Sequence, residues 1–144
     1  MTDLITRLSK LDAPDRGMDA EIEVAVRRIE AARSGLAEEY WANWQASPDG
    51  TVYDPHTRYS SNPFTASVDA VIALAARVLP GWRVENLCEW EDETLRSRGP
   101  WTCDLRKNGE NFFSPLKGKC GHAPSPAIAL CIALLRAKEA SHAE

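Results

Sequence analysis

The chain has 144 residues, of which 44% are hydrophobic and 26% are charged, and its formal net charge is −4. This composition is that of a globular protein, and the length suits one domain, so we expect residues 1–144 to fold as a single domain. The acidic balance argues against sequence-independent binding of duplex nucleic acid, which needs a basic surface.

The longest apolar run, residues 127–135, is too short to cross a membrane. The first residues show no signal-peptide pattern, so we expect a cytoplasmic protein. The four cysteines are expected to be free thiols in a reducing compartment, because none of them forms a close pair. They are Cys88, Cys103, Cys120 and Cys131.

Helical spacing of apolar residues predicts a helix over about residues 3–12 and a second helix from Asp19, as its N-cap, to Arg33. Gly35 is placed to end the second helix. Residues 36–45 predict a short helix with an aromatic stripe made of Leu36, Tyr40 and Trp44. Turn-forming residues then predict an irregular loop at about 46–66, in which only 51–53 could form a strand.

Ser67 is the expected cap of a helix that ends before Pro80. Alternating side chains predict strands over 82–90 and 101–106, and Asn108-Gly109 predicts a hairpin to a third strand at about 111–114. Ser125, followed by Pro126, is expected to open the last helix. Helices packed on a small antiparallel sheet give the class α+β.

The last helix is apolar on two faces. One face would pack on the sheet, and the other carries residues 129, 130, 133, 134 and 137, all alanine or leucine. A neighbouring helix of the same chain or a second subunit could cover that second face. On the second reading the protein is a homo-oligomer through its C-terminal helix.

Two segments have the composition of a ligand site. Tyr53, His56, Arg58 and Tyr59 could stack a planar ring and pair a phosphate, or form an exposed loop with tucked aromatics. Residues 118–125 precede a helix N-terminus, which suits phosphate or carboxylate, although a plain structural loop fits as well. This segment and the residue just before it contribute four candidate ligand-binding residues, namely Lys117, Lys119, His122 and Ser125.

The cysteines raise two further hypotheses. Cys88, Cys103, Cys120 and His122 could hold zinc if the fold gathers them, but their spacing fits no known pattern, and cysteines on inward strand positions behave as small hydrophobes. Cys120 and His122 could form a nucleophile and base pair, which would need a third group to orient the imidazole. We predict no catalytic residue, no metal and no cofactor.

Three stretches resemble small phage and prophage proteins of the ABA sandwich domain family. They are LSKLDAPDRGMDAEIEVAV, FTASVDAVIALAARVLPGWRVE and GHAPSPAIALCIALLRA, in the family's order over most of the chain. The resemblance implies an α/β/α sandwich, in which helices cover both faces of a central antiparallel sheet. The segment around 36–60 is less like the family, and no catalytic motif is carried over.

The resemblance suggests a phage-encoded binding protein in the host cell cytosol. Small phage proteins of this kind can withhold nucleotide signals of antiphage defence, so the expected ligand is a small anion such as a cyclic nucleotide or an ADP-ribose derivative. Two alternatives stay open. They are an interaction module that docks residues 40–44 on a host or virion protein, and an enzyme that uses Cys120 or His122.

Overall fold

The computed structural model describes residues 1–90, 99–111 and 120–143 and shows a mixed fold of helices and two small antiparallel sheets. The helices are α1 (Thr2–Leu8), α2 (Arg16–Arg33), α3 (Glu38–Trp41), α4 (Val68–Val78) and α5 (Pro126–Ala143). The strands are β1 (Gln45–Ala46), β2 (Thr51–Tyr53), β3 (Arg58–Ser60), β4 (Trp82–Glu89), β5 (Trp101–Lys107) and β6 (Cys120–Ala123). Among the described residues, no helix is apolar over a membrane's width.

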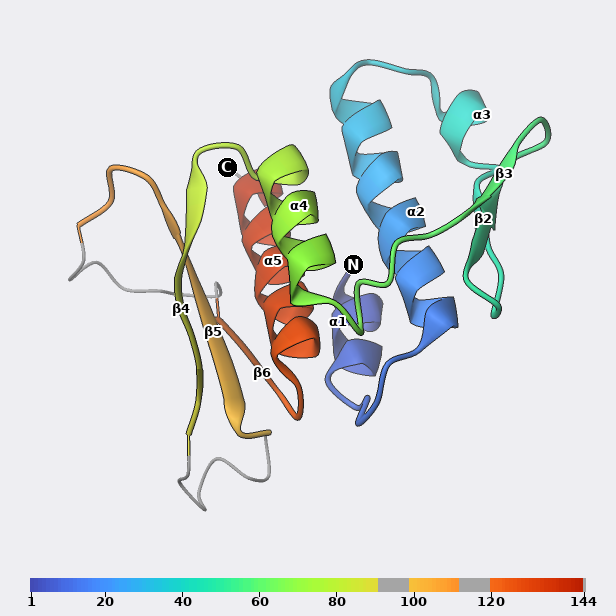
Figure 1. The fold of residues 1–144 in the computed structure, drawn as a ribbon. Helices are drawn as coiled ribbons and strands as arrows, with labels where there is room; N and C mark the ends of the chain where they lie inside the picture. The colour runs from blue at the N-terminus through green and yellow to red at the C-terminus, as the bar shows by residue number, and fades with distance from the viewer. Residues whose placement is uncertain (91–98, 112–119, 144) are drawn as a thin grey trace.

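Helices α1, α2, α4 and α5 lie between the two sheets, whereas α3 lies beside the smaller sheet (Figure 1). The larger sheet has the order β4-β5-β6, and α5 packs along one face of it, while α4 and α1 pack on α5. The smaller sheet, β1-β2-β3, lies at the opposite end of the molecule against α2. The expected single sheet is therefore two sheets, and the mixed class is confirmed.

Helix α5 is the centre of the hydrophobic core. Its sheet-facing residues and those of its second face are all buried within this one chain. Where β6 crosses the helix, Gly121 permits the approach, since a Cβ there would lie 2.1 Å from the carbonyl oxygen of Ala129. The second apolar face is thus covered by α4 and α1, the same-chain alternative, and it no longer argues for a second subunit.

A buried lysine joins α5 to the end of α4. Lys138 is 2% exposed, and its Nζ donates a hydrogen bond of 2.8 Å to the carbonyl oxygen of Val78, the last residue of α4. Burial lowers the pKa of Lys138. The ammonium group satisfies a carbonyl that the helix end leaves without an intrahelical partner.

Helix boundaries follow the predicted caps in most places. Ser67 accepts from the amide of Ala70, and Ser125 accepts from the amide of Ile128, so both predicted N-caps are confirmed. The predicted cap of α2 is wrong, because Asp15 accepts from the amide of Met18 and the helix begins at Arg16. Helix α1 ends at residue 8, earlier than predicted, although Leu4, Ile5 and Leu8 are buried as expected.

The segment at 36–66 differs most from expectation. Only residues 38–41 are helical, and Leu36 and Tyr40 are exposed, so the predicted aromatic stripe is not a buried face. The irregular loop contains the expected strand β2, which also pairs with β1 and β3. This pairing satisfies backbone groups that an irregular loop would leave to water.

The predicted strands at 82–90 and 101–106 are confirmed as β4 and β5, paired antiparallel with a bulge between Val84 and Asn86. The third strand of their sheet is β6, which the sequence reading placed in a loop. The strand predicted at about 111–114 falls almost wholly outside the described residues.

Candidate functional site

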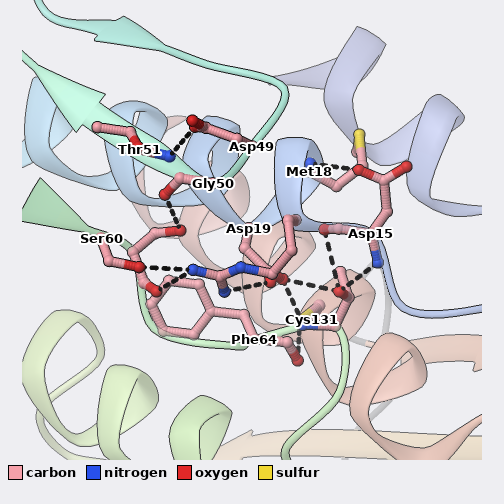
Figure 2. A network of polar contacts seen from close by, with 12 residues as sticks. Asp15, Met18, Asp19, Asp49, Gly50, Thr51, Ser60, Phe64 and Cys131 are labelled. Carbon is pink, nitrogen blue, oxygen red and sulfur yellow. Dashed lines mark hydrogen bonds and ion pairs between the residues drawn. The ribbon is translucent and has the colours of Figure 1, made fainter.

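A buried polar network anchors the segment that contains the candidate site to α2 (Figure 2). Asp19 is 1% exposed, and its Oδ1 accepts hydrogen bonds of 2.7 Å from the amide and from the hydroxyl of Thr65. Its Oδ2 accepts from Nη1 of Arg16 at 2.8 Å. A buried carboxylate with this many donors is well compensated, so Asp19 fixes Thr65 against the helix.

Arg16 carries the network outward to β3. Its Nη2 donates to the hydroxyl of Ser60 at 2.9 Å and to the carbonyl oxygen of Ser61 at 2.7 Å. Ser61 in turn donates from its hydroxyl to the carbonyl oxygen of Gly50 at 2.7 Å. Gly50 has φ +94°, and a Cβ there would lie 2.7 Å from Nε of Arg16, so glycine is required for both reasons.

The smaller sheet has one face toward α2 and one face toward solvent. Tyr53 and Arg58 are paired in the β2–β3 ladder, so their side chains leave the same, outer face, and Tyr53 is 39% exposed. Val52 and Tyr59 are the next pair and point to the opposite face, where they pack with Ala20, Val24 and Trp44. The sheet therefore separates Tyr59 from Tyr53 and Arg58.

The outer face is hollowed into an open cavity of about 530 Å³. Three of the four residues predicted in this segment line it, namely Tyr53, His56 and Arg58. The other lining residues are Ser47, Asp49, Thr51, Asp54, Pro55 and Thr57. This is the place where the described residues bring the predicted ligand-binding side chains together.

Two aspartates, Asp49 and Asp54, line the cavity and bond to the backbone of its turns. Asp54 accepts from the amides of His56 and Thr57, each at 2.7 Å, and Asp49 accepts from the amide of Thr51 at 2.9 Å. These backbone hydrogen bonds hold the pKa of each carboxyl below its usual range. The cavity thus combines one arginine with two carboxylates that are ionised at neutral pH.

Tyr59, the fourth predicted residue, lies under Arg27 of α2. The guanidinium carbon of Arg27 is 4.6 Å from the centroid of the Tyr59 ring. Burial, and then the nearby Glu23 carboxylate, raise the pKa of Tyr59 to about 12. Tyr59 is therefore not beside Tyr53, because successive residues of a strand face opposite sides.

The second predicted segment does not form a loop site in the part that the structure describes. Lys117 and Lys119 lie outside the described residues, and Cys120–Ala123 are strand β6. The Nδ1 of His122 is 3.1 Å from the hydroxyl oxygen of Thr102 on β5. Ser125 is occupied as the cap of α5.

The cysteines are not gathered into a zinc site. Cys103 is buried in the core beside α5, whereas Cys88 pairs with Thr102 and so shares the opposite face of the sheet with His122. The bulge in β4 places Cys88 there, out of step with the predicted alternation. Within the described ranges, no group of three or more His, Cys, Asp or Glu side chains could hold a metal ion.

Cys120 and His122 alternate on β6 and so leave the same face, where the Thr102 hydroxyl adjoins the imidazole. Thr102 is the kind of third group that the nucleophile hypothesis required. Sequence reasoning missed it because the pairing of β5 with β6 was not predicted.

Sequence reasoning also missed Asp49, Asp54 and Thr57 as lining residues of the outer cavity. Asp49 and Asp54 were identified only as turn residues. Their i+2 spacing to Thr51 and His56 is the signal of an Asx-turn, which turns the backbone amides toward the carboxylate, and the second oxygen of Asp54 accepts from the Thr57 hydroxyl.

We expect Asp19→Ala to lower the free energy of unfolding by about 3 kcal/mol, since it leaves the Arg16 and Thr65 donors without their charged acceptor. Urea unfolding measures the change. Asp12→Ala, at an exposed position, is the control and should shift stability by less than about 0.5 kcal/mol. Equal stability of the two variants would contradict the anchoring role.

We expect Tyr59 to release its proton late, at a pH of about 12. Because the unfolded chain releases this proton near the ordinary value of 10.0, the stabilising contribution is present below that pH and is lost as pH rises toward 12. Phenolate absorbance against pH, in the native chain and in Tyr59→Phe, measures the step. If the tyrosine lost from the titration curve in Tyr59→Phe is one that ionises near the ordinary value of 10.0, the Tyr59 hydroxyl is not shielded from solvent.

Comparisons with protein-family models, with curated proteins and with solved structures find no match to this chain. The resemblance to the ABA sandwich domain family stays a prediction.

Proposed function

We propose that the protein binds a small anionic nucleotide, without catalysis, on the outer face of the β1-β2-β3 sheet. The observation that carries the proposal is that one cavity gathers Tyr53, His56 and Arg58. The Tyr53 ring offers a surface for stacking a base, and the Arg58 guanidinium offers paired donors for a phosphate. The cavity volume of about 530 Å³ is within the range of small-molecule sites.

The two carboxylates narrow the class of ligand. Asp49 and Asp54 can accept hydrogen bonds from sugar hydroxyls or base N–H groups, and they repel surplus negative charge. A phosphodiester carries one charge on each phosphate, whereas a terminal phosphate carries nearly two at neutral pH. The bridging diphosphate of ADP-ribose has no terminal phosphate and carries two charges, as a cyclic dinucleotide does. A cyclic mononucleotide, with one charge, therefore suits this cavity best.

The biological setting of the proposal comes from the resemblance. The protein would be a phage-encoded sponge in the host cytosol that withholds a nucleotide signal of antiphage defence. Assembly into a homo-oligomer would need a surface other than α5, which this one chain encloses by itself. A cavity that opens to solvent fits a protein that captures a ligand without chemical conversion.

Calorimetry with cyclic mononucleotides, cyclic dinucleotides and ADP-ribose tests the binding. We expect one cyclic class to bind at micromolar concentration, and Arg58→Ala to weaken it at least about tenfold by removing a charge-assisted hydrogen bond. Arg33→Ala removes the same charge from an exposed position outside the cavity and should leave affinity unchanged. The absence of binding at high micromolar concentration across the panel would refute the proposal.

The exposure of α3 favours a second candidate function, a protein-interaction module. None of its residues is buried, and Tyr40 is 64% exposed, so its aromatic ring is accessible to a partner. The partner would be a host or virion protein with an apolar surface.

Purification from infected cells should then recover one stoichiometric partner with the native chain. We expect Tyr40→Ala to abolish recovery while Glu39→Ala, at a neighbouring exposed position, retains it. Recovery that is equal with both variants would remove α3 as the docking element.

A further inference from the structure

A second cavity lies between α2, the α2–α3 connection and the end of α4, on the other side of the small sheet from the nucleotide site. Its volume is about 480 Å³. Its walls include two arginines, Arg27 and Arg77, together with the indole of Trp44 and the side chain of Leu36. Basic and aromatic groups therefore meet here, in a place that no part of the proposed function uses.

A buried carboxylate holds both arginines in position. Glu23 is 2% exposed, and its Oε1 accepts from Nε of Arg27 at 3.0 Å and from Nη2 of Arg77 at 3.3 Å. Glu23 and Arg27 lie one helical turn apart on α2, while Arg77 comes from the last turn of α4. The carboxylate thus orients two guanidinium groups from different helices toward one cavity.

Aromatic contacts fix the Arg27 plane further. Its guanidinium carbon lies 4.6 Å from the ring centroid of Tyr59 and 5.9 Å from that of Trp44. Both distances are within the range of cation–π attraction. Arg27 is therefore held by a buried carboxylate and by two rings before any ligand arrives.

The two arginines keep donors for a ligand. In the part of the chain that the structure describes, Nη1 and Nη2 of Arg27 and Nη1 of Arg77 bond to no protein atom, and each arginine side chain is about 40% exposed. A guanidinium with free terminal nitrogens can pair an oxyanion in a fork geometry. Two such groups beside one cavity give preorganised recognition of a single anion.

Glu30 is the acidic group that faces this cavity. Its Oε1 contacts Nε of Arg77 at 3.3 Å, and its side chain is 41% exposed. A solvent-exposed pair of this kind contributes little to stability. An incoming anion can therefore share Arg77 with Glu30 or displace it at low cost.

We propose that this cavity binds a planar aromatic anion, a ring that bears one phosphate or carboxylate group. The oxyanion pairs with the outer nitrogens of Arg27 and Arg77, and the ring lies against the Trp44 indole and Leu36. The site is separate from the proposed nucleotide site, because Tyr53 and Arg58 leave the opposite face of the sheet.

Phenyl phosphate is the probe for this site. Its binding is monitored through the indole N–H resonance of Trp44 in proton–nitrogen NMR spectra. Trp44→Phe identifies that resonance among the five tryptophans. We expect saturable shifts of the Trp44 signal with phenyl phosphate and weaker binding of cyclohexyl phosphate, which lacks a planar ring. Binding should also weaken as salt concentration rises.

Arg77→Gln should weaken phenyl phosphate binding at least about tenfold, while Arg58→Ala should leave it unchanged. Unaltered resonances of the other indoles in Arg77→Gln report that the variant stays folded. A Trp44 signal that does not move up to several millimolar probe, or that moves equally in the native chain and in Arg77→Gln, overturns the proposal. Loss of binding in Arg58→Ala instead would assign the anion to the outer cavity.

Discussion

The arrangement of the outer cavity depends on one buried carboxylate, that of Asp19. The small sheet consists of strands of two or three residues, which form no stable sheet alone. Asp19 ties Thr65 to α2, and Arg16 extends the connection to Ser60 and Ser61, so the end of the sheet segment is fixed to the helix (Figure 2). The ladder and the two turns can then hold the outer cavity in one shape.

A second constraint is the position of α5. A helix that is apolar on all sides must be enclosed, and here one sheet and two helices of the same chain enclose it. The remaining helix, α2, then has its own apolar residues divided between this core and the small sheet. The buried Asp19 and Glu23 of the same helix are each paired with arginine.

Local signals in the sequence predicted the elements whose ends are capped, such as the helix opened by Ser67 and the helix opened by Ser125. These local signals failed where contacts between distant parts of the chain determine the structure. Asp19 has the chemistry of an N-cap, but Asp15 takes that role and Asp19 bonds to Thr65, 46 residues away. Strand β6 is equally non-local, since its glycine and polar residues become a strand only by pairing with β5. The sequence predicted which residue types form the candidate site. That the Tyr59 side chain points to the other face of the sheet could be known only from the β2–β3 register.

The shortness of the strands in the small sheet has a consequence for protein engineering. Under the sheet, Val52, Ala46 and Tyr59 of the strands pack with Ala20 and Val24 of α2, so the sheet shares its apolar interior with the helix. A peptide covering residues 45–66 would lose that support together with the Arg16 and Asp19 contacts. The binding surface would therefore not keep its shape as an isolated loop. A graft onto another scaffold must include the first two turns of α2.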